Sequence, residues 1–410
     1  MNMSDFYSDG ARRLKPSAIR KMVHLIDKPG IISLAGGMPS TETFPMDIIR
    51  ELFDQVYARR GPAAFQYGLT GGIRELAVWL AEFMATRGVT ASSENIIMTS
   101  GSQQALRLVG EVFLDPGDVA VVELPSYIGG TTALRNAGAD LVGVSQADDG
   151  IVTDELDATV ARLKAQGRRV KLLYTIPNFQ NPSGISISTS KRREILRLAA
   201  RHDFLIIEDD PYYELFFGDS VEQPTMKSLD EDGRVIYLSS FSKILAPGFR
   251  AAWMCADPAI VRTIEIAKEA ADICSSTMDQ AIVLAYCKDG HLARHVPKIR
   301  RFYYERRNVM VDALRRHMPA GVTWTEPSGG FFCWARLPSG LDSEAMLPES
   351  VDRGVAYVVG APFHVDGGGQ NTLRLAYSKE APNSLTRGVE ILSKLISDHL
   401  RDPNGSRTGN

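Results

Sequence analysis

Seven short apolar segments follow one another through the middle of the chain, and most are separated by stretches in which apolar residues recur at helical spacing. The segments span residues 96–99, 119–123, 141–144, 170–175, 204–208, 235–239 and 251–254. Strands that alternate with helices form a largely parallel sheet with helices on both faces, and nearly continuous apolar strands suit that burial. The sequence therefore predicts an α/β fold with a mainly parallel seven-stranded sheet between helices.

The length of the chain and the pattern of its last third predict a second domain. A chain of 410 residues is too long for one compact core. Helical spacing is present at residues 17–26, 47–59, 72–87, 102–113, 154–166, 190–202, 259–286, 294–317 and 384–399, with further strands expected at 330–335 and 372–377. We expect an N-terminal segment that joins a smaller α+β domain, then a large domain, the small domain and a disordered tail, at residues 1–45, 46–290, 291–401 and 402–410.

The charge and the cysteines exclude several classes of protein. The formal net charge of −3 provides no strong attraction to nucleic acid or to a membrane surface. The four cysteines lack metal-binding spacing and are typical of buried thiols in a reducing compartment; they are Cys255, Cys274, Cys287 and Cys333. The sequence shows neither the features of a signal peptide nor an apolar run of membrane-spanning length. We therefore expect a cytoplasmic protein that binds no nucleic acid, membrane or metal ion.

A lysine follows the strand at residues 235–239 in a stretch rich in hydroxyl groups. The stretch from Ser239 to Arg250 contains three serines, Lys243 and, seven residues after the lysine, the arginine. A neutral lysine amine can form an imine with an aldehyde cofactor, while hydroxyl groups and a bidentate arginine can bind that cofactor's phosphate. This pattern indicates the cofactor lysine of a pyridoxal 5′-phosphate (PLP) enzyme. A solvated surface lysine shows the same short motif, so the interpretation depends on the other strand ends.

Two further strand ends carry groups that suit a phosphate and an aromatic ring. Ligands of open α/β sheets bind beyond the carboxyl ends of the strands. Residues 100–106 form a glycine-containing turn that opens a helix, where free N–H groups attract phosphate; an ordinary N-cap by Ser102 is the alternative. Tyr127 follows the strand at 119–123 and can stack on a pyridine ring, or is an ordinary half-buried tyrosine.

The next strand ends carry an amide and a carboxylate. Asn181 lies in an Asn-Pro-Ser-Gly turn, where its amide can reach a phenolic oxygen and a substrate carboxylate, although this sequence is also a frequent turn by itself. Asp209 ends a buried strand, where a carboxylate needs a partner such as a pyridinium nitrogen. A metal-binding pair of aspartates is the alternative, but neither a Walker-type loop nor a nearby histidine accompanies it.

In series, these motifs resemble those of the fold-type I PLP aminotransferases of class I/II, and more narrowly the 2-aminoadipate and kynurenine aminotransferase group. The class-wide motifs are Gly101–Leu106, Asn181-Pro182-x-Gly184, Asp209-x-x-Tyr212, Ser240-x-Ser242-Lys243 with Arg250, and Asn371–Leu375. The narrower group is indicated by Ser17-x-x-Arg20, Ile32–Pro39, Phe65–Tyr67, Glu208–Tyr213 and Tyr357–Gly360. The resemblance covers residues 15–400 and implies that the large domain binds PLP.

The resemblance implies a role for each matched residue. Lys243 would carry the cofactor and move a proton, Asp209 would pair with the pyridinium nitrogen, and Tyr127 would stack on the ring. Other cofactor contacts would come from Ser102, Gln103, Ser240, Ser242 and Arg250 at the phosphate, Asn181 and Tyr212 at the phenolic oxygen, and Tyr67 reaching from a second subunit. The substrate would contact Arg374, Asn181 and Gly37, with Arg20 and Ser17 on an N-terminal helix that faces an acidic side chain.

The implied function is transfer of the amino group of an L-amino acid to 2-oxoglutarate by a ping-pong mechanism, in a homodimer with active sites at the interface. The donor would be 2-aminoadipate-like, aromatic or aliphatic. Other PLP reactions on this fold, such as lysis, decarboxylation or oxidation, share the cofactor residues and stay open as alternatives. A ligand-sensing domain is less favoured because we expect no DNA-binding region, and a nucleotide-binding protein because no G-x-G-x-x-G or Walker loop follows a strand. Residues 68–70 and 363–369 depart from the group's pattern, which leaves the particular substrate open.

Overall fold

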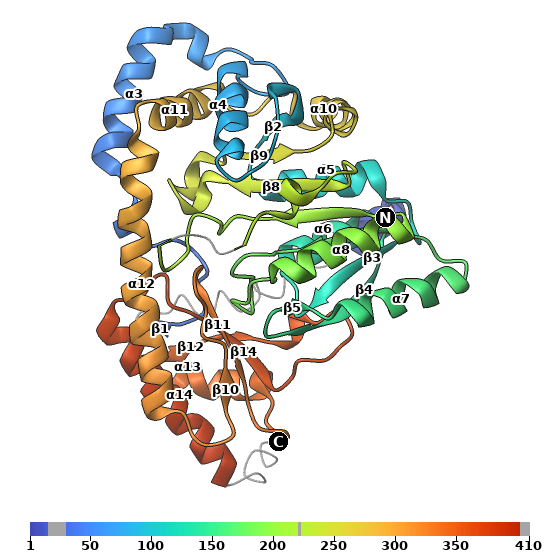
Figure 1. Ribbon diagram of the computed structural model, residues 1–410. Helices are drawn as coiled ribbons and strands as arrows, with labels where there is room; N and C mark the ends of the chain where they lie inside the picture. Colours follow the sequence, from blue (N-terminus) through green and yellow to red (C-terminus); the bar gives the residue numbers. More distant parts are fainter. Residues whose placement is uncertain (15–29, 220–222, 402–410) are drawn as a thin grey trace.

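The large sheet has eight strands in the order β2-β9-β8-β7-β6-β3-β4-β5 (Figure 1). The computed structural model describes residues 1–14, 30–219 and 223–401. The strands are β2 Ile96–Thr99, β3 Val119–Leu124, β4 Asp140–Ala147, β5 Gly150–Ile151, β6 Val170–Thr175, β7 Leu205–Asp209, β8 Val235–Ser240 and β9 Ala252–Cys255. Neighbours from β8 to β4 run parallel, whereas β9 is antiparallel to both β8 and β2. Every strand predicted for this sheet is confirmed, and the short antiparallel β5 is the addition.

Helices cover both faces of this sheet, because alternate residues of each strand point to opposite sides. Ala120 and Val122 of β3 belong to one apolar core, and Val119 and Val121 to the other. The first core is built with α3 Met46–Arg60, α4 Arg74–Ala85, α5 Ser102–Phe113, α6 Ile128–Asn136, α10 Pro258–Asp272 and α11 Thr277–Lys288. The second is built with α7 Thr153–Ala165, α8 Thr189–His202 and α9 Met226–Leu229.

The helical region predicted as continuous over residues 259–286 is two helices, α10 and α11. The chain leaves the helical conformation at Ile273, whose φ is 63°. Ser276 then caps α11, because its hydroxyl oxygen accepts a hydrogen bond of 3.3 Å from the N–H of Asp279. The apolar periodicity continues across this break, so periodicity alone does not reveal it.

A smaller antiparallel sheet has the strand order β10-β11-β14-β13. Its strands are β10 Thr323–Trp324, β11 Phe332–Arg336, β13 Val358–Val359 and β14 Thr372–Ala376. Beside it, β1 Ile32–Ser33 pairs in parallel with β12 Val355–Ala356, so an N-terminal segment is joined to the C-terminal part. The helices α13 Ser343–Asp352 and α14 Pro382–Arg401 pack around a separate apolar core with these strands.

The long helix α12 His291–His317 runs along one side of both sheets (Figure 1). Ile299 and Tyr303 pack into the core of the large sheet, while Met310 and Leu314 pack into the core of the small sheet. The remaining helical turns are η1 Met3–Phe6, α1 Asp9–Arg13, η2 Thr41–Thr43, η3 Gly61–Phe65, η4 Ser93–Asn95, η5 Phe241–Lys243, η6 Pro247–Phe249 and η7 Ala361–Phe363.

Several features expected from the sequence stay predictions. The helix expected at residues 17–26 and the tail at 402–410 lie outside the described residues. The domain boundaries at residues 45/46 and 290/291 stay predictions. Among the helices that are described, none is both long and apolar enough to cross a membrane.

Candidate active site

One cavity of about 580 Å³ lies at the carboxyl ends of the central parallel strands. Most of the predicted site residues line it: Gly37, Ser102, Gln103, Tyr127, Asn181, Asp209, Tyr212, Ser240, Ser242, Lys243, Arg250 and Arg374. They come from far apart in the sequence, and the ends of parallel strands bring them to the same edge. The small sheet closes the cavity with Arg374 and Val358, and residues 33–38 form a further part of its wall.

Lys243 lies in η5, directly after β8, and its amine points at an aromatic ring rather than at a carboxylate. Its Nζ is 5.6 Å from the centroid of the Phe331 ring. Burial, together with the nearby cations Arg374 and Arg250, lowers the pKa of Lys243 to about 8, while Asp209 opposes this shift. A lysine with this pKa has a substantial neutral fraction near physiological pH, which an amine needs in order to act as a nucleophile or base.

Asp209 ends β7 with one oxygen paired and the other free. The hydroxyl of Tyr174 donates a hydrogen bond of 2.9 Å to Oδ2 of Asp209. Within the described chain, Oδ1 of Asp209 is buried without any hydrogen-bond partner. Burial raises the pKa of Asp209 to about 7, against the effect of the Tyr174 hydrogen bond. A buried, unpartnered carboxylate oxygen at a cavity wall is suited to a cationic ring nitrogen.

Tyr174 was not predicted as a site residue, because it reads as one more buried position of the apolar strand β6. The structure shows that its environment is specific. A Cβ atom at Gly130 would lie 2.3 Å from the Tyr174 ring, so only glycine leaves room for this ring. A tyrosine directly after two leucines in a largely buried strand, with its hydroxyl needing a partner, is the signal that was available in the sequence.

The end of the cavity near α5 offers cationic and hydroxyl groups. The guanidinium of Arg250 lies against Gly101, where a Cβ atom would be only 2.0 Å from Nη2. Gly101 precedes α5 with φ at 90° and supplies no side-chain cap, so the first N–H groups of that helix stay available. Ser240 and Ser242 share a hydrogen bond of 2.8 Å between their hydroxyl groups. Such an arrangement suits a phosphate group.

Arg374, in the middle of β14, is a buried guanidinium held by two oxygen atoms. Nη1 donates to Oδ1 of Asn181 and Nη2 donates to the carbonyl of Ala35, each at 2.8 Å. Its Cζ lies 4.3 Å from the centroid of the Phe332 ring. Burial lowers the pKa of Arg374 to about 10, so this group still carries its charge at neutral pH. Gly37 faces it: a Cβ there would lie 3.5 Å from Nη2 and would collide with Phe332 at 2.8 Å.

Two tyrosines border the space between these groups. Tyr127 precedes α6, and Gly129 leaves room for its ring, because a Cβ there would lie 2.5 Å away. Tyr212 packs edge-on against Phe331, with ring centroids 5.5 Å apart, and burial raises its pKa. Both hydroxyl groups therefore stay protonated at neutral pH and can donate hydrogen bonds.

The turn that carries Asn181 is fixed by a buried carboxylate that sequence reasoning did not single out. Nε2 of Gln180 donates to Oε2 of Glu123 at 2.9 Å and to the carbonyl of Pro125 at 2.8 Å. The N–H of Ile176 donates to the same carboxylate at 3.2 Å. One side-chain amide thus ties the Asn181 turn to the segment that precedes Tyr127.

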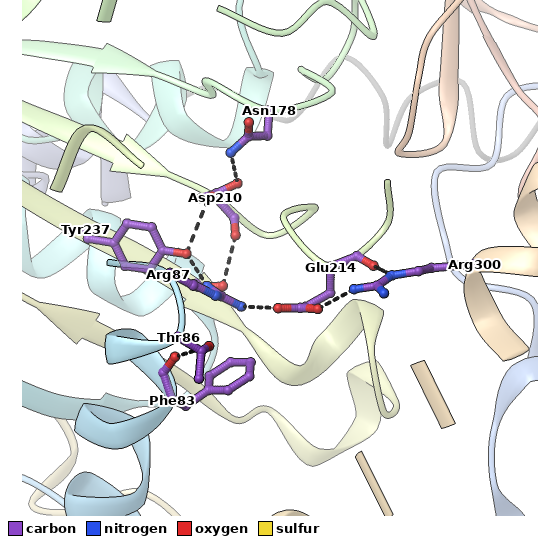
Figure 2. A network of polar contacts seen from close by, with 9 residues as sticks. Phe83, Thr86, Arg87, Asn178, Asp210, Glu214, Tyr237 and Arg300 are labelled. Carbon is purple, nitrogen blue, oxygen red and sulfur yellow. Dashed lines mark hydrogen bonds and ion pairs between the residues drawn. The ribbon is translucent and has the colours of Figure 1, made fainter. Parts of the chain in front are cut away.

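A second polar network is built around Asp210, the residue that follows Asp209 in the chain (Figure 2). The adjacent Asp210 accepts hydrogen bonds from Asn178 at 3.0 Å and from the hydroxyl of Tyr237 at 3.3 Å. Arg87 donates to Tyr237 and pairs with Glu214 at 3.0 Å, and Glu214 also pairs with Arg300 of α12 at 2.6 Å. This network anchors the end of β7 to α4 and to the long helix.

Of the remaining predicted site residues, only Tyr67 is described, and it does not line the cavity. Tyr67 is 76% exposed and lies outside the cavity wall, beside Cys274 and Thr277. Ser17 and Arg20 lie outside the described residues. Their roles stay predictions.

A lysine with a lowered pKa, an unpartnered carboxylate and a cationic, hydroxyl-rich end at the strand termini together define a PLP-dependent enzyme. Comparison with known proteins agrees with this class. Residues 29–392 match the family described as aminotransferase class I and II. The chain belongs to this family: it is a PLP-dependent transaminase whose substrates are amino acids and 2-oxo acids.

Three similar proteins represent the family. Aromatic-amino-acid aminotransferase 1 of Thermococcus litoralis is 42% identical over 402 residues, which cover 98% of this chain and 96% of that one. The structure of Pyrococcus horikoshii kynurenine aminotransferase in complex with PMP has a TM-score of 0.94 and 40% identity, covering 97% of this chain and 98% of that chain. The α-aminoadipate aminotransferase of Thermus thermophilus, complexed with N-(5′-phosphopyridoxyl)-L-leucine, has a TM-score of 0.90 and 35% identity, covering 98% of this chain and 100% of that chain.

Proposed function

We propose that this transaminase moves the amino group of a 2-aminoadipate-like, aromatic or aliphatic L-amino acid to 2-oxoglutarate. The observation that carries the proposal is that Arg374 and Lys243 line the same cavity. Arg374 is suited to bind a carboxylate, and Lys243 is suited to accept and donate a proton. The donor classes are supported by the names of the relatives, which act on aromatic amino acids, kynurenine and α-aminoadipate. A single carboxylate-binding arginine supports a ping-pong mechanism, in which the donor and the acceptor occupy the same place in turn.

The residues at the strand ends fit PLP. PLP, once bound, disperses the negative charge that develops on the substrate Cα when its proton leaves. Lys243 would be the attachment point and would move this proton, for which its lowered pKa is an advantage. Oδ1 of Asp209 would pair with the pyridinium nitrogen, and Tyr127 would stack on the ring. The phosphate would be bound by Arg250, Ser102, Gln103, Ser240 and Ser242, which lie at one end of the cavity wall.

The substrate end of the cavity would orient the amino acid. Arg374 would hold the α-carboxylate with its planar fork, and the hydrogen bond to Asn181 keeps that fork in one orientation. Gly37 would leave room for the carboxylate, since any side chain there collides with Phe332. Asn181 and Tyr212 would contact the phenolic oxygen of the cofactor. This orientation would direct the Cα–H bond toward Lys243, so that the reacting groups are aligned before the proton moves.

The proposal also includes assembly of the protein as a homodimer. Tyr67 is exposed in the single chain, as expected of a residue that would act in the site of a second subunit. Large apolar side chains nearby in the sequence are also exposed, namely Phe53, Tyr57, Phe65 and Leu69. Sedimentation of the purified protein would test this assembly. Location in the cytoplasm stays a prediction from the sequence.

The first experiment is an absorbance spectrum of the purified holoenzyme before and after addition of single amino acids without an oxo acid. We expect loss of the visible cofactor band with a suitable donor and one equivalent of the matching oxo acid. The Lys243→Ala variant should lose turnover by about 10³-fold or more while it still binds PLP non-covalently. Stoichiometric glutamate from 2-oxoglutarate supports transamination, whereas release of ammonia or of carbon dioxide from the donor would contradict it.

A further inference from the structure

Lys379 is a second cation on the substrate side of the cavity. It lies three residues after β14, is exposed, and lines the same cavity as Arg374. Its Cδ would be 3.7 Å from a Cβ atom at Gly36, so its aliphatic stem passes over that glycine. Within residues 1–14, 30–219 and 223–401, the Lys379 amine forms neither an ion pair nor a hydrogen bond.

Both neighbours of Lys379 are attached to the cavity wall, which fixes where this side chain begins. The hydroxyl of Ser378 donates to the carbonyl of Met38 at 2.7 Å and to that of Gly36 at 3.3 Å. Oε1 of Glu380 accepts a hydrogen bond of 3.2 Å from the backbone N–H of Ser33. The adjacent carboxylate is therefore engaged by the backbone and does not neutralise the lysine.

Lys379 and Arg374 lie against consecutive glycines. A Cβ at Gly37 would be 3.5 Å from Nη2 of Arg374, and a Cβ at Gly36 would be 3.7 Å from Cδ of Lys379. Because consecutive Cα atoms are about 3.8 Å apart, the two cations border one short segment of wall. Arg374 is buried at the inner end, and the exposed Lys379 lies toward the solvent.

Among the residues that the structure describes, the charged side chains that line the cavity provide no ion-pair partner for Lys379. They are Asp209, Lys243, Arg250, Lys379 and Arg374. In the proposed function, the cofactor phosphate lies at Arg250, the ring nitrogen at Asp209 and the α-carboxylate at Arg374. A substrate with a second carboxylate at the end of its side chain would supply the missing anion.

We infer that Lys379 is a specificity-determining residue that binds the distal carboxylate of dicarboxylic substrates such as glutamate, 2-oxoglutarate and 2-aminoadipate. This inference rests on the proposed function, because it takes the orientation of the substrate from Arg374. Amino acids with neutral side chains instead contact the apolar part of the same wall, formed by Met38 and Val358. An exposed lysine attracts a carboxylate by a screened interaction, so it favours dicarboxylates without being required for the chemistry.

The test compares two amino donors in Lys379→Met holoenzyme. Single half-reactions with L-glutamate and with L-phenylalanine are followed by the visible absorbance. We expect kcat/KM for glutamate and the affinity for the unreactive dicarboxylate glutarate to fall about tenfold, which corresponds to about 1.4 kcal/mol. The loss should appear in KM rather than in kcat, because charge recognition of the side chain acts equally on bound substrate and transition state. The phenylalanine reaction should change by less than about twofold.

Three further variants make the result specific. Lys379→Arg should restore the preference for glutamate, and Lys164→Met, which removes an exposed lysine on α7, should leave both reactions unchanged. In the unaltered protein, the affinity for glutarate should fall as salt is added, because salt screens the charge of Lys379. If Lys379→Met keeps the glutamate preference, or if only Arg20→Met removes it, the inference is wrong. If the unaltered holoenzyme transfers no amino group from any donor, the proposed function fails instead.

Discussion

Nη1 of Arg374 donates a 2.8 Å hydrogen bond to Oδ1 of Asn181, which joins the small sheet to the turn after β6 of the large sheet. The proposed carboxylate site therefore exists only where the two sheets meet. Because Nη2 is also held, by the carbonyl of Ala35, the fork is oriented before any substrate arrives. Such preorganisation reduces the cost of ordering the site on binding.

Replacement of Arg374 by lysine should lower kcat/KM for every amino donor by about 100-fold. The variant keeps a positive charge but loses the planar fork and at least two charge-assisted hydrogen bonds. Steady-state kinetics with an aromatic and an acidic donor would measure the loss. Asn181→Ala, which leaves Arg374 in place but frees Nη1, should show a smaller loss of about tenfold. An unchanged KM in Arg374→Lys would show that the carboxylate binds elsewhere.

Removal of the Tyr174 hydroxyl should weaken PLP binding about tenfold. Tyr174→Phe takes away the hydrogen bond to Oδ2 of Asp209, which stabilises the charged carboxylate and so opposes the burial that raises its pKa. The pKa of Asp209 would rise further, and less of its negative charge would face the ring nitrogen at neutral pH. Equilibrium dialysis of PLP would measure the change.

The matched control for Tyr174 is Tyr357, another buried tyrosine. Its hydroxyl donates a 2.6 Å hydrogen bond to the carbonyl of Ser343 in the core of the small sheet. Tyr357→Phe should lower stability to a similar degree but leave PLP affinity unchanged. Equal losses of PLP affinity in the two variants would assign the effect to general destabilisation and not to Asp209.

Attachment of PLP to the apoprotein should depend on pH with a midpoint at about 8. Only the neutral amine of Lys243 can form the covalent bond, and burial lowers the pKa of this amine from 10.5 to about 8. The rate should rise about tenfold per pH unit below the midpoint and level off above it, because the neutral fraction is then complete. Stopped-flow absorbance would follow the reaction. A midpoint near 10.5 would contradict the lowered pKa, and Lys243→Ala should show no covalent attachment at all.

Replacement of Arg87 by methionine should reduce the free energy of unfolding by about 3–5 kcal/mol. The Arg87 side chain is only 2% exposed and pairs with Glu214 (Figure 2). Its Cζ also lies 4.4 Å from the centroid of the Tyr213 ring. Loss of the guanidinium removes one of the two arginines that pair with the partly buried Glu214 carboxylate. Urea unfolding would measure the difference.

The control for Arg87 is an arginine of the same chain with a solvated ion pair. The side chain of Arg107 is 74% exposed, and its nitrogen lies 3.9 Å from Glu111. Arg107→Met should therefore change stability by less than about 0.5 kcal/mol. A similar, small effect at both positions would mean that the network around Asp210 contributes little to the stability of the fold.

The sequence predicts seven strands of the large sheet because each of these is a short apolar run that ends in a turn, whereas β5 has only two residues. The site residues at those ends could be predicted for the same reason, since parallel strands place their carboxyl ends together. Residues that act by positioning other side chains could not be predicted in this way. Tyr174 and Glu123 lie inside strands and look like core positions until their partners across the sheet are known. Lys379 looks like any solvated lysine until the wall that it borders is folded.

The pairing of the very short strands beside the small sheet could not be predicted from the sequence either. β1 and β12 each have two residues, too few for a periodic pattern, and they pair across more than three hundred positions of chain. The break between α10 and α11 escaped prediction because it depends on the backbone of Ile273 rather than on a glycine or proline.

The attachment of residues 33–38 to the last part of the chain has a consequence for biosynthesis. Ser33 and Gly36 leave the ribosome more than three hundred residues before their partners in β12 and at Ser378 are made. Chains grow at about 5–20 residues per second, so this piece of the wall must wait for many seconds without its partners while the large sheet can already form. The cavity is therefore completed only once Ser378 has been made, and a nascent chain stalled before Ser378 would hold a lysine at the end of β8 but no finished place for a substrate.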